Sequence, residues 1–136
     1  MPEVSKTRLN EFLEFYGKAR SRAELQVERE VFSTNAGISS YTTPEQADAL
    51  AELLDLRQES LLLDVGSGKG WPALYLAERS GCTAVLTDVP LAGVRAAAAT
   101  AAARRLQSRC AVAAASGTHL PLRRRTFDAV VLSDVL

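Results

Sequence analysis

The residues best suited to chemistry lie in one short segment, Leu61-Leu-Leu-Asp-Val-Gly-Ser-Gly-Lys-Gly70. In it the acid Asp64 precedes three alternate glycines, Gly66, Gly68 and Gly70. Glycine accepts a positive φ and carries no Cβ, so a ligand can approach the backbone of such a loop closely. The loop follows a short apolar run that is typical of a buried strand, and open α/β sheets bind ligands at the C-terminal ends of their strands. The segment therefore predicts a ligand-binding loop.

The glycine spacing restricts the kind of ligand. The phosphate-binding pattern G-x-x-x-x-G-K-[ST] is absent, so Lys69 is predicted to be a solvated side chain of the loop. The dinucleotide fingerprint G-x-G-x-x-G is not met either, because Trp71 occupies the position of its third glycine. A nicotinamide-dependent oxidoreductase therefore remains only as a weaker alternative.

A second acid, Asp88, follows the predicted strand 83–87 and lies 24 residues beyond Asp64 (88 − 64). A carboxylate at this place can accept hydrogen bonds from both hydroxyls of a ribose, as it does in dinucleotide-binding folds. The alternative is that Asp88 caps a helix, since Pro90 begins one soon afterwards. Both roles are compatible with the sequence.

The pattern Asp-x-Gly-x-Gly-x-Gly resembles motif I of the class I S-adenosylmethionine-dependent methyltransferases. The order of later residues is also typical of that family: Asp88, then the segment 115–121 with its Leu-Pro, then Phe127-Asp128. The resemblance implies that the glycine loop lies against the methionine part of the cofactor and that Asp64 helps to fix the loop and the amino group. Family members often have an aspartate, which contacts adenine, where this chain has Ser116.

The resemblance assigns a set of expected residues. Because Ser116 carries no charge, backbone groups of Gly117 are expected to contribute to the adenine contact. No catalytic residue is assigned, since the family's lie at the end of the fourth strand and beyond, and no metal site is expected. The expected S-adenosylmethionine-binding residues are Asp64, Gly66, Ser67, Gly68, Gly70, Trp71, Asp88, Val89, Ser116, Gly117 and Ser133.

The surrounding sequence predicts the elements that hold these residues. Two helices are expected in the first 35 residues, the second starting at a Ser21/Glu24 capping box, with a polar loop at 33–42. Thr43-Pro44-Glu45-Gln46 predicts another helix start, with its end near Arg57. Strands are then expected at 61–65, 83–87, 111–115 and 128–133, with helices at 70–80 and 90–107 between the first three.

This alternation predicts an α/β fold with a Rossmann-like parallel sheet, and the resemblance implies the strand order 3-2-1-4. We expect a helical segment and loop at 1–42 and an S-adenosylmethionine-binding domain at 43–136. A family sheet normally has seven strands, so the chain is expected to be the N-terminal, cofactor-binding portion of a longer enzyme. The apolar fourth strand would then be an edge, open to self-association or to a partner chain.

Composition narrows the functional classes. The 16 basic and 16 acidic residues cancel, which makes nucleic acid an unlikely partner. No apolar signal region or membrane span is evident, so a cytoplasmic protein is expected. The predicted function is methyl transfer from S-adenosylmethionine to an unidentified acceptor, most simply a small molecule. The alternative is a half-domain that binds the cofactor without chemistry or is completed by a partner.

Overall fold

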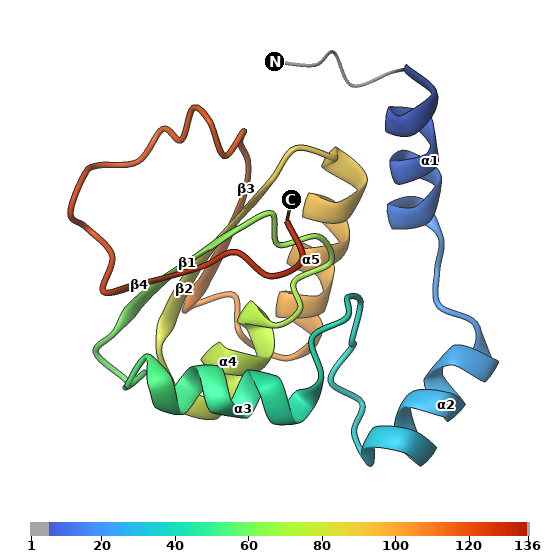
Figure 1. Ribbon diagram of the computed structural model, residues 1–136, viewed down its shortest axis with the longest axis horizontal. Helices are drawn as coiled ribbons and strands as arrows, with labels where there is room; N and C mark the ends of the chain where they lie inside the picture. Colours follow the sequence, from blue (N-terminus) through green and yellow to red (C-terminus); the bar gives the residue numbers. More distant parts are fainter. Residues whose placement is uncertain (1–5, 136) are drawn as a thin grey trace.

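The computed structural model describes residues 6–135 and shows a parallel sheet with helices packed against it and a helical N-terminal arm (Figure 1). The elements are α1 (Lys6–Gly17), α2 (Arg22–Phe32), α3 (Pro44–Leu53), β1 (Leu61–Val65), α4 (Ala73–Ser80), β2 (Thr83–Asp88), α5 (Leu91–Ala103), β3 (Cys110–Ala114) and β4 (Ala129–Val131). No helix in this part of the chain is long and apolar enough to cross a membrane.

The four strands form one sheet in the order β3-β2-β1-β4, and every neighbouring pair is parallel. Leu62 of β1 lies opposite Ala84 of β2 on one side and Ala129 of β4 on the other. Each strand therefore ends at the same edge of the sheet, which gathers the segments that follow β1, β2, β3 and β4. The predicted fold class and strand order are confirmed.

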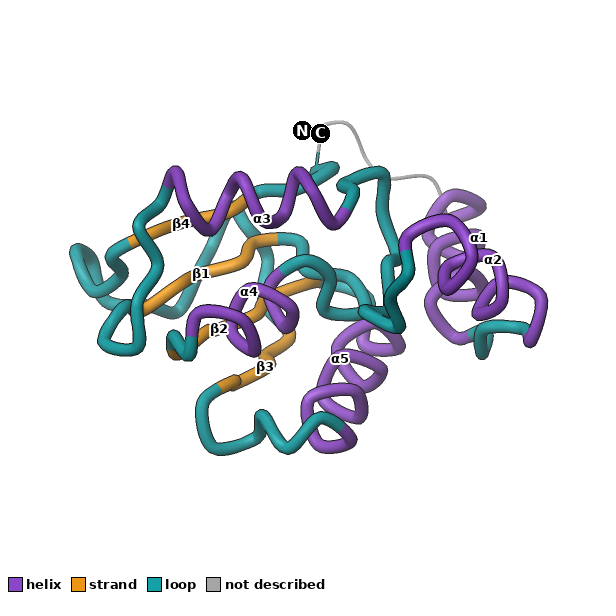
Figure 2. The backbone as a smooth tube through the Cα atoms, turned by 90° about the horizontal axis from the view of Figure 1, so that it is seen from below, coloured by secondary structure: helices purple, strands orange, loops and turns teal. Residues whose placement is uncertain are grey.

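The core lies between one face of this sheet and the helices α3, α4 and α5. Leu62, Leu76 and Leu86 are fully buried there. The alanines of α5 that face the core, such as Ala97 at 0% exposure, bring that helix close to β2 and β3. Figure 2 shows this layer with the N-terminal arm, α1 and α2, lying beyond α5. The rigid layer fixes the place at which the glycine loop leaves β1.

Both predicted capping boxes are present, at Ser21/Glu24 and at Thr43/Gln46. Several predicted ends differ. Helix α3 stops at Leu53 instead of Arg57, because Leu54 begins a turn. Helix α5 stops at Ala103 instead of 107, and α4 starts at Ala73 instead of 70. Strand β4 is limited to 129–131, the residues that pair with β1.

The N-terminal arm is tied down by its own contacts. Helix α1 packs against α5. Glu28 of α2 is only 3% exposed, accepts a hydrogen bond from the Gly37 N–H at 2.7 Å and pairs with Arg20. This carboxylate anchors the start of the segment that runs from α2 to α3. The arm is thereby placed beside the glycine loop.

Candidate cofactor-binding site

The loop after β1 adopts the conformation that its glycines permit. Gly66, Gly68 and Gly70 have φ values of 78°, 53° and 102°. A Cβ on Gly66 would lie 2.3 Å from a methyl of Val135, and one on Gly70 would lie 2.5 Å from a methyl of Leu74. Both the backbone angles and the packing of neighbouring segments therefore require glycine.

The N–H groups of this loop are engaged by the protein itself. Those of Gly66 and Ser67 donate to the Thr87 carbonyl at 2.7 and 3.0 Å. The Gly68 N–H donates to the Asp88 carboxylate at 2.7 Å, and the Gly70 N–H donates to the Ser67 carbonyl at 2.8 Å. A phosphate-binding loop needs its N–H groups for the ligand. The hydrogen bonding therefore argues against a pyrophosphate ligand, in agreement with the spacing of the glycines.

Asp64 lies beneath the loop with unsatisfied polar atoms. Its side chain is 1% exposed, and neither carboxylate oxygen has a hydrogen-bond partner among the described residues. Burial, followed by repulsion from Asp88, raises its pKa to about 7, whereas the nearby backbone N–H of Ala73 lowers it. The Ser67 hydroxyl is also buried without a partner. Unpartnered buried acceptors are rare in folded proteins, where a ligand, an ion or an ordered water commonly satisfies them.

Asp88 ends β2 and supports the loop from the other side. Its two carboxylate oxygens accept the N–H groups of Gly68 and Val89, each at 2.7 Å. The sequence left open whether Asp88 caps the following helix. In the structure Pro90 is the N-cap of α5, with no side-chain cap. Asp88 therefore stabilises the glycine loop and is not the cap of α5.

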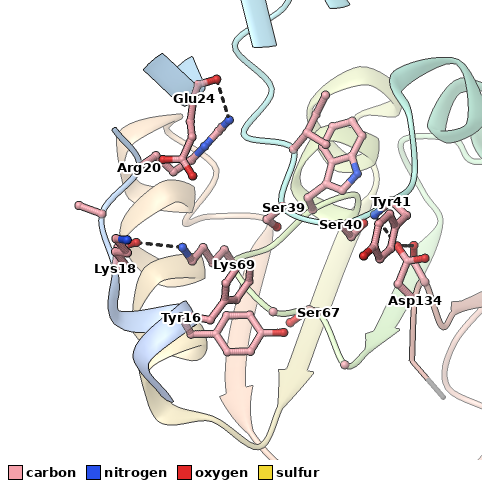
Figure 3. A pocket seen from close by; sticks show the side chains of 17 residues that line it. Tyr16, Lys18, Arg20, Glu24, Ser39, Ser40, Tyr41, Ser67, Lys69 and Asp134 are labelled. Atoms are coloured by element: carbon pink, nitrogen blue, oxygen red, sulfur yellow. Dashed lines mark hydrogen bonds between the residues drawn. The ribbon is translucent and has the colours of Figure 1, made fainter. Parts of the chain in front are cut away.

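A cavity of about 640 Å³ opens beside the glycine loop (Figure 3). Five of the predicted cofactor residues line it: Gly66, Ser67, Gly68, Trp71 and Ser133. The others, Asp64, Gly70, Asp88, Val89, Ser116 and Gly117, are not among its lining residues. The volume lies in the range typical of small-molecule sites.

The predicted adenine segment lies near Asp88 but outside this cavity. The Ala115 N–H donates to the Asp88 carbonyl at 2.9 Å, which holds the ends of β2 and β3 together. Ser116 is exposed, and its hydroxyl lies 2.9 Å from that of Thr118. A Cβ on Gly117 would lie 3.0 Å from a methyl of Val65, so this glycine fits closely against the end of β1. The sheet thus brings the predicted residues to one edge, in two neighbouring groups.

The cavity has walls that the sequence did not reveal. Figure 3 shows Tyr16, Lys18 and Lys69 on one side and Tyr41 and Asp134 on the other. The Asp134 carboxylate accepts the Tyr41 N–H at 3.1 Å, and hydrogen bonds from the 40–42 segment lower its pKa. No local pattern signals these contacts, because each joins segments that are far apart in the chain.

Lys69, predicted to be a solvated side chain of the loop, is partly exposed but also makes specific contacts with the N-terminal arm. Its ammonium donates to the Lys18 carbonyl at 3.0 Å and lies 5.3 Å from the centre of the Phe15 ring. Burial lowers its pKa. The side chain turns back over α1 because that helix lies across the loop.

Comparison with known proteins identifies the family. Residues 62–136, more than half of the chain, match the sequence model of a family described as a methyltransferase domain. The chain belongs to this methyltransferase family. Membership confirms the resemblance to class I S-adenosylmethionine-dependent methyltransferases that the glycine loop predicted, and S-adenosylmethionine is the cofactor of that family.

Solved structures show the same fold. The methyltransferase chain is similar to a SAM-dependent methyltransferase from Thiobacillus denitrificans in complex with S-adenosyl-L-homocysteine (20% identity, TM-score 0.61, 87% of this chain and 45% of that one). It is similar to an RNA methyltransferase from Salinibacter ruber in complex with S-adenosyl-L-homocysteine (22%, 0.61, 67% and 58%). It is also similar to the [4+2]-cyclase SpnF (32%, 0.56, 69% and 35%).

The chain spans less than two thirds of the length of each of these proteins. A search of curated protein sequences gave no match.

Proposed function

We propose that this methyltransferase chain binds S-adenosylmethionine and forms the cofactor half of an enzyme that methylates a small molecule. The observation that carries the proposal is the buried pair of orphaned groups, Asp64 and the Ser67 hydroxyl, under a loop that borders a 640 Å³ cavity. An ammonium group offers the N–H donors that these oxygen atoms lack. The residues therefore fit the amino-acid end of this cofactor.

The chemistry divides simply between cofactor and protein. Bound S-adenosylmethionine supplies a methyl carbon that its sulfonium makes electrophilic. The protein then has to bind and orient, because correct placement of two reactants removes most of the entropic barrier. Gly66 and Gly68 present backbone without side chains to the cavity, Asp88 would accept the ribose hydroxyls, and Trp71 forms a wall that its Nε1–H bond to the Thr42 carbonyl holds at 2.8 Å. No described residue is assigned as the catalytic one.

A small molecule is the acceptor class that the charges favour. The chain is neutral overall, with 16 basic and 16 acidic residues, whereas RNA-binding surfaces are strongly basic. The cavity wall itself mixes signs, with Lys18, Arg20 and Lys69 against Glu24 and Asp134. These observations support a small polar acceptor over a polyanion.

A second candidate is cofactor binding without methyl transfer, in a domain completed by further polypeptide. SpnF, which is 32% identical to this chain, is a [4+2]-cyclase, so this fold is not tied to one reaction. Val130 and Leu132 at the β4 edge are 49% and 60% exposed, which leaves an apolar edge that a second chain could cover. Methyl transfer by the isolated chain would exclude this candidate.

The test is calorimetric titration of the purified chain with S-adenosylhomocysteine. Asp88→Asn keeps an oxygen acceptor for the Gly68 N–H but removes the charge. It should weaken binding by about 2 kcal/mol, or roughly 30-fold. The matched control is Asp55→Asn, since Asp55 pairs with Arg57 at the exposed end of α3 and has a φ of 48°, which asparagine also adopts. A folded, monodisperse chain that does not bind would overturn the proposal.

The acceptor class is tested separately with methyl-labelled S-adenosylmethionine. The chain is incubated with a small-molecule extract and, in parallel, with total RNA. Label in the small-molecule fraction supports the proposal. Label in the RNA contradicts the acceptor class while leaving the cofactor assignment in place.

A further inference from the structure

The ring of Tyr16 packs against the junction between the glycine loop and the first turn of α5. A Cβ on Gly68 would lie 3.0 Å from Tyr16 Cε1 and 3.3 Å from its hydroxyl oxygen. A Cβ on Gly93, in the first turn of α5, would lie 3.3 Å from Tyr16 Cδ1. The absence of side chains at both positions therefore lets one aromatic ring cover the junction between the loop and the helix.

This ring lies next to Asp88. Burial, and then the nearby Asp88 carboxylate, raise the pKa of the Tyr16 hydroxyl. Tyr16 and Gly68 line the 640 Å³ cavity, whereas Asp88 does not, although its carboxylate accepts the Gly68 N–H. Tyr16 thus forms the cavity wall on the side of Asp88.

Lys69 holds the helix that carries this ring. Its ammonium donates to the Lys18 carbonyl, just beyond the C-terminal end of α1, and lies over the ring of Phe15. A cation at this end of a helix is also favoured by the helix dipole. The residue that ties α1 down therefore stands inside the glycine loop itself, between Gly68 and Gly70. A shift of the loop is transmitted to α1 through this contact.

We propose that Tyr16 is a gate over the ribose side of the cofactor site and that Lys69 latches the gate closed. The inference rests on the proposed function, because it takes Asp88 as the acid that binds ribose. A nucleoside that approaches Asp88 from the cavity must displace the ring from Gly68 and Gly93. Opening moves α1 away from α5 and breaks the contact of Lys69 with the Lys18 carbonyl.

The test is the association rate of S-adenosylhomocysteine, followed in a stopped-flow instrument by the fluorescence of Trp71. Trp71 is the only tryptophan of the chain and lines the same cavity. Tyr16→Ala should raise the association rate constant about tenfold or more, because minor open states are typically populated at 10% or less. Leu13→Ala is the control: it shortens a large, 39% exposed side chain of the same helix that does not line the cavity.

A second variant protects the test against misfolding. Lys69→Met keeps the ring and an unbranched side chain but removes the latch, so it should also raise the association rate. If Tyr16→Ala does not fold, as judged by circular dichroism, this variant decides the matter. Binding by Tyr16→Ala where the unmodified chain binds too slowly to follow would support the gate strongly.

Two results would overturn the gate. Association that is unchanged or slower in Tyr16→Ala and Lys69→Met, with binding by the unmodified chain intact, shows that Tyr16 only packs or contacts the cofactor. Absence of binding by the unmodified chain and by every variant overturns the proposed function, and the gate falls with it.

Discussion

Replacing Asp64 with asparagine should stabilise the ligand-free protein at alkaline pH and have a smaller effect at acid pH. Asp64 is 1% exposed, and burial raises the pKa of its carboxyl to about 7 from an ordinary value of 3.8. When the pKa of a carboxyl is higher in the folded state, there is a pH range between the two pKa values. In that range the folded protein keeps the proton and the unfolded protein has lost it. Stability is therefore full below about pH 4 and falls as the pH rises to about 7.

The magnitude follows from the shift. Each pKa unit corresponds to about 1.4 kcal/mol, so the free energy of unfolding falls by about 4 kcal/mol over the whole pH range between the two pKa values. The part between pH 5 and pH 7 is about 3 kcal/mol. Asparagine has nearly the same shape as the protonated acid and does not titrate. The difference in unfolding free energy between Asp64→Asn and the unmodified chain should therefore grow by about 3 kcal/mol from pH 5 to pH 8.

The assay is urea unfolding of both proteins at pH 5 and pH 8, followed by circular dichroism. Comparing the two proteins at each pH cancels the titrating groups that do not interact with Asp64, which leaves Asp88 as the coupled neighbour. A difference that does not change with pH would show that Asp64 is ionised in the folded state and has partners that the structure does not record. Asp64→Asn should also lose S-adenosylhomocysteine binding, because the proposed contact with the ligand's ammonium group needs the carboxylate. A residue that serves binding in this way commonly lowers the stability of the ligand-free protein.

Substitutions at three further positions test the supports of the site. Gly66→Ala should destabilise the fold by about 2 kcal/mol, since φ is 78° and a methyl of Val135 would lie 2.3 Å from the new Cβ, and thermal unfolding will show it. Glu28→Ala should cost about 2 kcal/mol by leaving the part-buried Gly37 N–H without its acceptor, whereas Glu28→Gln should cost less; urea unfolding separates the two. Thr43→Ala should cost about 1 kcal/mol through loss of the α3 cap, measured in the same way, and Thr43→Ser should be nearly neutral.

The parts of the fold that depend on local patterns were predictable. The apolar run 61–65 is a strand with the predicted bounds, and Gly81 ends α4 with a φ of 77°. The boundaries that differ are helix and strand ends without a strong local signal. Helix α5 has alanine and arginine at its end, all good helix formers, and it stops because the chain must turn back to bring Cys110 into register with Ala84.

Part of the site could also be predicted from local patterns in the sequence. The order of glycines and acids along the chain, together with the parallel sheet, places Asp64, Asp88 and Gly117 at one edge, since parallel strands end on the same side. Lys69 shows the limit of this reasoning. Its neighbours in the sequence are glycines, which predict an open loop, and only the position of α1 brings the Lys18 carbonyl within reach of its ammonium.

The sequence by itself determined the family, the parallel α/β alternation, the two capping boxes and the composition of the glycine loop, because each is written in residues that are close together. Tertiary structure alone decided that the Asp64 carboxylate is buried without a partner, that β2 accepts the N–H groups of Gly66, Ser67 and Gly68, and that Tyr16 covers the side of the cavity next to Asp88. Burial, hydrogen-bond partnership and pKa depend on groups brought from distant parts of the chain. Spacing along the chain cannot specify them.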